Sequence, residues 1–289
     1  MKNLILSSLM TLLPLAASAG AVETVVVRAV RWDASWKPAS AEQWTKSAAS
    51  AAAAAAKGAD IVVFPEDFTA SLAGLAPKDA PAAAFATRVV EDSLYPALKE
   101  AAGKTTVVLG AYARSGRGAE PSYRVAILDG GHWSWFDKTD LTPAESAALP
   151  GAKPGFSLPV LRRAGGLWAV VPGYSLQKTE VANSLKRRGL QLILTPSSAA
   201  DALSGSRVLR VASSRAVELG AAVVVAAPAG SLMFLPAQEG IDAAPENGDS
   251  EAHRVPWKKL LELRTRDGAA AKAEARPFLD PTNLRQVEL

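Results

Sequence analysis

Apolar stretches separated by glycine, proline and charged residues divide this chain into alternating strands and helices. Residues 59–66, ADIVVFPE, are apolar without polar alternation, which predicts a strand buried on both faces. Residues 23–30, 104–113, 167–171 and 190–198 are rich in β-branched and other apolar residues and predict further strands. Strands that alternate with helices favour one α/β fold.

Four longer segments between these strands predict helices. Residues 40–57 are rich in alanine, with Ser40 as the expected N-cap and Gly58 just beyond the last turn. Residues 82–102 form a second candidate helix, which Pro96 is expected to break or kink. The other two predicted helices cover residues 179–188 and 206–219.

A hairpin and a loop complete the predicted organisation. Asp129, Gly130 and Gly131 separate two extended runs, which is typical of a tight β-hairpin. Residues 237–252 are rich in glycine, proline and acidic residues and predict a loop. Because no segment resembles a linker, we expect residues 22–289 to form a single domain.

The N-terminus has the pattern of a secretory signal peptide. A short positive start at residues 1–3 precedes an apolar run at 4–15 and small residues at 17–21. We therefore expect residues 1–21 to be a leader cleaved after Ala19 or Ala21, which leaves a periplasmic or secreted protein without a membrane attachment. An uncleaved anchor and a first core helix are the alternatives.

The amino-acid composition limits the kinds of functional site that the protein can have. The 289 residues are 49% hydrophobic, enough for a large core, and contain no cysteine and only two histidines. No disulfide or thiol nucleophile is therefore available, and we expect no metal site and no cofactor. We expect His132 and His253 to be surface or capping residues. The net charge of +4 is dispersed and accompanies no recognition motif, so nucleic-acid binding is not expected.

Three positions with chemical interest follow predicted strands. Glu66 follows Pro65 at the end of one strand, Lys138 ends the hairpin, and Gly173 lies in a sharp turn after a third strand. Ligands in α/β folds commonly bind where strands end. These positions therefore mark the candidate site.

The sequences around these positions resemble the nitrilase, or carbon–nitrogen hydrolase, superfamily. GADIVVFPEDF resembles the strand that ends in the family's catalytic Glu, WFDKTDLTPAE the segment with its Lys, and PGYSLQKTE the segment with its Cys. Tyr174, Leu176 and Glu180 match the last pattern without a gap. Three further segments match in order: GLQLILTPSS, SSRAVELGAAVVVAAPAG and RPFLDP. The similarity extends from about Glu23 to the C-terminus.

The resemblance implies an α-β-β-α sandwich that forms a homodimer through the helices covering its sheets. It also implies attack of a thiolate on an amide or nitrile, with Glu66 as the base and Lys138 stabilising the developing charge. Gly173, however, occupies the cysteine position and Ser175 the position of an aspartate. Asp140 and Arg124 are further departures, from a usual His and a usual Asn.

Because glycine has no side chain, covalent catalysis at position 173 is impossible. We therefore favour a noncatalytic binding or interaction module whose vestigial pocket takes a small polar or amide-like ligand. The alternative is a divergent hydrolase of small amides that uses Ser175 or a water activated by Glu66. A purely structural interpretation also stands, in which Glu66 and Lys138 form a partly buried ion pair and Glu145 only orients Lys138. For Arg215 and Glu218, spaced three apart on one predicted helix, a structural role is favoured.

Overall fold

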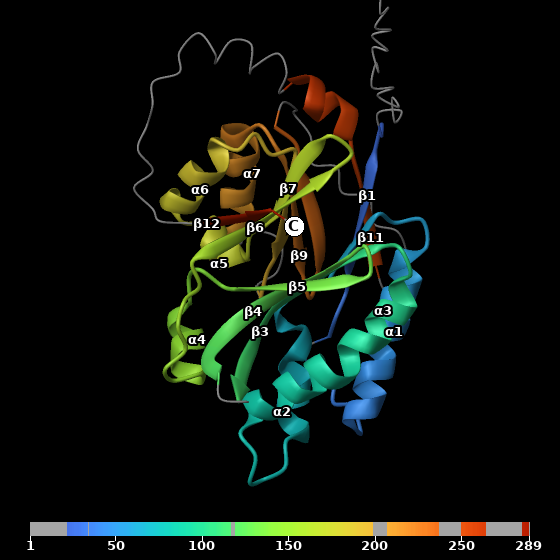
Figure 1. Cartoon of the computed structure of the whole chain (residues 1–289), viewed down its shortest axis with the longest axis vertical. Helices are drawn as coiled ribbons and strands as arrows, with labels where there is room; N and C mark the ends of the chain where they lie inside the picture. The colour runs from blue at the N-terminus through green and yellow to red at the C-terminus, as the bar shows by residue number, and fades with distance from the viewer. Residues whose placement is uncertain are drawn as a thin grey trace, which may run out of the picture.

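Two six-stranded sheets pack face to face, with helices on both outer faces (Figure 1). The computed structural model describes residues 22–33, 35–116, 119–198, 207–236, 250–263 and 285–288. The elements of the first half are β1 (Val25–Val30), α1 (Ala41–Ala56), β2 (Ile61–Val63), η1 (Glu66–Leu75), α2 (Ala82–Val89), η2 (Val90–Leu94), α3 (Tyr95–Ala102), β3 (Thr106–Gly116), β4 (Ala119–Asp129), β5 (His132–Asp137) and α4 (Pro143–Ala148).

The second half builds the other sheet and supplies one further strand to the first. Its elements are β6 (Ser157–Arg163), β7 (Gly166–Val170), α5 (Gly173–Leu176), α6 (Thr179–Lys186), β8 (Leu192–Pro196), α7 (Arg207–Leu219), β9 (Ala222–Ala227), β10 (Gly230–Phe234), β11 (Ser250–Val255), a helix over 257–263 and β12 (Arg285–Glu288). The strand order is β11-β1-β2-β3-β4-β5 in the first sheet and β10-β9-β8-β7-β6-β12 in the second.

The buried residues form three layers of core, which explains the continuous apolar strands. In β2, Ile61 and Val63 face the second sheet, whereas Val62 faces the helices α1 and α3 on the outside. The outer face of the second sheet packs against α6 and α7. A strand covered on both sides has no polar face. The predicted α-β-β-α sandwich is therefore confirmed.

The helix around Pro96 continues through the proline by changing its winding. Residues 82–102 are helical throughout, but the turn at Val90–Leu94 is a π-helix. Proline cannot donate the hydrogen bond that a helix interior needs, and a wider turn just before it accommodates this loss. The expected disturbance thus takes the form of a π turn and not of a break.

Most predicted elements are present, with two corrections. Ser250, Glu251 and Ala252, expected in a loop, begin β11, which pairs with β1. His253, expected at the surface or in a cap, is buried with its Nε2 2.7 Å from Ser231 Oγ. The predicted signal peptide, the rest of the predicted loop and the RPFLDP segment lie outside the described residues. Within the described part of the chain, no helix is long and apolar enough to cross a membrane.

Candidate functional site

Loops that follow β2, β5, β7 and β8 meet at one end of the two sheets. Glu66 begins η1 directly after β2, Lys138 follows β5, and Gly173 begins α5 after β7. Ser197 and Ser198 follow β8. The structure therefore brings together the three positions at which the sequence placed the candidate site, and adds a fourth segment.

Lys138 lies between two carboxylates at the centre of this site. Its Nζ donates to Glu145 Oε1 at 2.7 Å and lies 3.2 Å from Glu66 Oε1. The side chains of Lys138 and Glu66 are only 1% and 4% exposed. The second oxygen of Glu66, Oε2, accepts the backbone N–H of Ser198 at 3.0 Å. One ammonium is thus shared by two carboxylates in a nearly dry environment.

Glu145 is held in place by the helix that carries it. Its Oε2 accepts the backbone N–H of Thr142 at 2.7 Å, while Thr142 Oγ1 accepts the N–H of Glu145 at 3.1 Å. This reciprocal capping box opens α4. Because one carboxylate oxygen is fixed by the cap, the other is aimed at Lys138. This geometry agrees with the expected orienting role of Glu145.

Burial and charge shift the pKa values of the two most buried members in the same direction. Burial raises the pKa of Glu66 above its usual 4.5, and the nearby Lys138 ammonium offsets this only in part. Burial opposes ionisation of Lys138, but the charges of Glu66 and Glu145 outweigh it and raise its pKa above 10.5. Lys138 therefore remains an ammonium near neutral pH, whereas Glu66 holds its proton more tightly than an exposed glutamate.

Two glycines let the backbone pass close to the charged residues. A Cβ atom on Gly110 of β3 would lie 2.4 Å from the carbonyl oxygen of Pro65, next to Glu66. A Cβ atom on Gly155 would lie 2.3 Å from the carbonyl oxygen of Asp137, next to Lys138. No side chain fits at either contact, so both glycines are required by the close approach.

The turn at Gly173 is closely packed. A Cβ atom on Gly173 would lie 2.9 Å from Ser197 Oγ and 3.2 Å from Ser197 Cβ. Ser197 is itself buried, and its carbonyl oxygen accepts the N–H of Glu66 at 3.4 Å. The side chain of Ser197 thus takes up space beside the turn that a side chain at 173 would need.

Ser175 lies next to this turn but away from solvent. It is completely buried, and Thr139 Oγ1 donates to its Oγ at 3.4 Å.

Arg215 Nε donates to the carbonyl oxygen of Leu176 at 3.3 Å, and Arg215 also pairs with Glu218. Arg215 thus attaches α7 to the end of α5, and Glu218 holds Arg215 from the same helix. These contacts are the structural role that the sequence favoured.

A cavity of about 510 Å³ opens beside Glu66, and we call it the Glu66 cavity. Its charged lining residues are Glu66 and Glu145, and its polar lining includes Tyr123 and Ser198. Nine of its sixteen lining residues are alanine. Neither Ser175 nor Ser197 is among them. The cavity therefore presents two carboxylates against a largely apolar wall of short side chains.

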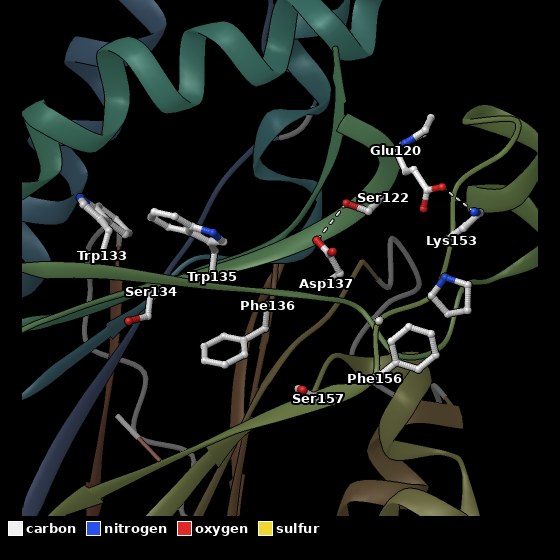
Figure 2. A pocket seen from close by; sticks show the side chains of 13 residues that line it. Glu120, Ser122, Trp133, Ser134, Trp135, Phe136, Asp137, Lys153, Phe156 and Ser157 are labelled. Carbon is white, nitrogen blue, oxygen red and sulfur yellow. Dashed lines mark hydrogen bonds and ion pairs between the residues drawn. The ribbon is translucent and has the colours of Figure 1, made fainter. Parts of the chain in front are cut away.

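A second cavity, of about 580 Å³, lies along β5 and contains none of the predicted site residues. Figure 2 shows Trp135 and Phe156 on either side of it, with the Glu120–Lys153 ion pair at its rim. Trp135 is 51% and Phe156 75% exposed. Trp133, two residues before Trp135, instead stacks on Tyr95 at 4.2 Å. The two tryptophans therefore differ, one packed and one at the surface.

Sequence reasoning missed the residues that shape the site without carrying its charge: Gly110, Thr142, Gly155, Ser197 and Ser198. A glycine inside an apolar strand was the available signal for Gly110, because it marks a bulge or a close backbone approach. No local signal indicated Ser197, whose role depends on a strand 24 residues after Gly173 along the chain. Within the described residues, no group of three or more histidine and acidic side chains is placed to hold a metal ion.

Comparison with protein-family models finds no match to this chain, and comparison with curated protein sequences finds none either. Similarity emerges at the level of structure. An amidase from Nesterenkonia sp. superimposes with a TM-score of 0.62 and 19% identity, over 85% of this chain and 95% of the amidase. A mutant of the Nesterenkonia sp. AN1 amidase in complex with butyramide gives 0.62 and 18%, over 85% of this chain and 96% of that one.

Saccharomyces cerevisiae Nit3, a member of branch 10 of the nitrilase superfamily, is similar to the same extent. Its TM-score is 0.63 at 18% identity, over 84% of this chain and 94% of Nit3. The Nesterenkonia amidase is likewise described as an enzyme of the nitrilase superfamily. At such low identities the similarity establishes the fold, which is the nitrilase-type α-β-β-α sandwich.

Proposed function

We propose that this protein is a noncatalytic member of the carbon–nitrogen hydrolase superfamily whose Glu66 cavity binds a small polar ligand. The observation that carries the proposal is the pair Gly173 and Ser197. The nucleophile position has no side chain, and Ser197 leaves little room for one. The charged groups, by contrast, remain grouped at a cavity.

The geometry of Ser175 supports this choice over the hydrolase alternative. A nucleophile must reach the reacting carbon at close to contact distance. Ser175 is fully buried and does not line the Glu66 cavity. A water activated by Glu66 is the remaining hydrolytic route, and it would replace a thiolate with a much poorer nucleophile. Loss of a nucleophile costs related catalytic systems on the order of a million-fold in rate.

The test combines activity and binding in one set of proteins. Ammonia release is measured from a panel of aliphatic amides and nitriles, with Glu66→Gln and Lys138→Ala beside the wild type to reveal a contaminating hydrolase. The expected result is no turnover, together with ligand-dependent thermal stabilisation, because a ligand stabilises only the state it binds. Turnover that disappears in Glu66→Gln would overturn the proposal in favour of an activated water.

Two further properties belong to this proposal. The leader pattern at residues 1–21 supports export to the periplasm or the medium, with cleavage after Ala19 or Ala21. Mass spectrometry of the mature protein tests this, and a main form that still carries Met1 would contradict it. Pairing of two subunits through the helices on the second sheet is supported by Val217, which is 67% exposed on the outer surface of α7.

A further inference from the structure

The charged residues that line the Glu66 cavity are both acidic, and no cationic side chain lines it. Within the part of the chain that the structure describes, Lys138 Nζ is the one cation that pairs with either carboxylate. With both carboxylates ionised, the group of three has a net charge of −1. Lys138 does not line the cavity, whereas Glu66 and Glu145 do. A ligand entering the cavity therefore meets acceptors with negative charge and no cationic lining residue.

One of these acceptors has a partner that it shares with the other carboxylate. Glu66 Oε1 is buried 3.2 Å from Lys138 Nζ, and the same Nζ donates to Glu145 Oε1 at 2.7 Å. The Glu66 side chain is only 4% exposed, and it lines the cavity. A charged donor stabilises a carboxylate more than a neutral donor does. Because Lys138 divides its charge between two carboxylates, a ligand that brings a further cation is favoured over a neutral one.

The walls restrict the rest of such a ligand. Nine alanines leave an apolar space of short side chains, within a volume of about 510 Å³. This size is typical of small-molecule sites. An aliphatic chain gains from contact with such walls, whereas a carboxylate or a phosphate would face Glu66 and Glu145 with like charge.

We propose that the Glu66 cavity binds a short primary aliphatic amine as its ammonium ion, with the carboxylates of Glu66 and Glu145 as acceptors and the alanines around its alkyl chain. This inference rests on the proposed binding function and gives it a ligand class. The amine resembles an amide in shape but offers three donors and a positive charge. The carboxylates therefore favour a positively charged ligand, and the alanine wall limits the length of its alkyl chain.

The test compares three ligands of equal length: butylamine hydrochloride, butyramide and sodium butyrate. Each is titrated into the full chain at neutral pH and constant ionic strength, by calorimetry and by thermal shift. We expect butylammonium to bind about tenfold or more tightly than butyramide, and butyrate not to bind. If butyramide or butyrate binds as well as butylammonium, the amine inference fails while the binding function stands. If none of the three binds or stabilises the protein, both fail.

Two variants connect binding to the cavity. Glu66→Gln is expected to lower butylammonium affinity about tenfold or more and to leave butyramide affinity within about twofold. Ala144→Leu places a larger side chain at the cavity wall, on an exposed position of α4, and is expected to weaken butylammonium by a similar factor. Ala147→Leu, on the same helix and outside the cavity, is the matched control. Equal affinities in the two leucine variants would place the binding elsewhere and overturn the inference.

Discussion

A Cβ atom at position 173 and the hydroxyl of Ser197 would be separated by only 2.9 Å. Ser197, directly after β8, thus fills part of the space that a side chain at position 173 would occupy. The absence of a side chain at position 173 and the placement of Ser197 belong to one local arrangement. This coupling between the residues is directly measurable.

The first prediction concerns this coupling. Gly173→Ala is expected to destabilise the protein by about 1–3 kcal/mol, because the new methyl group overlaps Ser197 in a packed interior. In a Ser197→Gly background the same substitution is expected to cost less, because both contacting side-chain atoms are gone. Denaturant unfolding of the four proteins gives the interaction energy as a double-mutant cycle. Strictly additive effects would show that the two positions do not compete for space.

The second prediction concerns the buried ammonium. Lys138→Ala leaves Glu66 and Glu145 facing each other without a cation, and we expect a loss of about 3–5 kcal/mol in the free energy of unfolding at neutral pH. The matched control is Lys153→Ala, which breaks the 65% and 70% exposed pair with Glu120 and is expected to cost about 0–1 kcal/mol. Similar losses in the two variants would mean that burial does not strengthen the Lys138 interactions.

The third prediction follows from the raised pKa of Glu66. A folded-state pKa above 4.5 means that the folded protein binds this proton more tightly than the unfolded chain. The contribution of Glu66 to stability is therefore fully present below pH 4.5 and is lost as the pH rises through the folded-state pKa. The slope for one proton is at most about 1.4 kcal/mol per pH unit.

This pH dependence is measured as a difference. Lys138 and Glu145, which face Glu66, are kept, and Glu66→Gln removes only the titrating group. We expect the stability of the wild type, relative to Glu66→Gln, to decrease as the pH rises from about 4.5. A relative stability that increases over this interval would mean that Lys138 lowers the pKa of Glu66 more than burial raises it.

The fourth prediction concerns a buried pair of tyrosines on the outer face of the first sheet. The hydroxyl oxygens of Tyr95 and Tyr112 lie 2.5 Å apart, and burial raises the pKa of Tyr95 to about 12. Tyr112→Phe removes this partner from the Tyr95 hydroxyl, so we expect a loss of about 1–3 kcal/mol. Adding Tyr95→Phe removes the remaining hydroxyl and is expected to recover part of it. A double variant less stable than the single one would contradict this account.

The fifth prediction tests the proposed subunit pairing. Val217→Glu places a charge on the exposed face of α7 and is expected to convert a dimer into a monomer. Ala54→Glu, at an exposed position of α1 on the opposite outer face, is the control and should remain dimeric. Light scattering after size exclusion gives the mass of each. A monomeric wild type, or dissociation only in Ala54→Glu, would overturn pairing through α7.

Local patterns predicted the alternating strands and helices, whereas the α-β-β-α arrangement was implied by the resemblance to the nitrilase superfamily. Each of these local patterns lies within a few residues of the element that it indicates. The continuous apolar run in β2 indicated a strand, and the glycines that follow α1 and α6 indicated where those helices end. Glu66 and Lys138 were singled out because each comes at the end of a predicted strand, and the resemblance implied their roles. Ser197 and Gly155 were missed because their roles arise from backbone and side-chain contacts between distant segments. Such contacts leave no periodic pattern in the chain.

The pairing of β1 with β11 has a consequence for how the protein folds. Val25 pairs with Val255, so the partner of β1 on this edge lies 230 residues later in the chain. Until that partner is synthesised, β1 has an open edge able to pair with another chain. Contacts so distant in sequence form slowly. The nascent chain is therefore expected to be prone to aggregation while this edge is open. We expect it to need a chaperone until residue 250 has been synthesised.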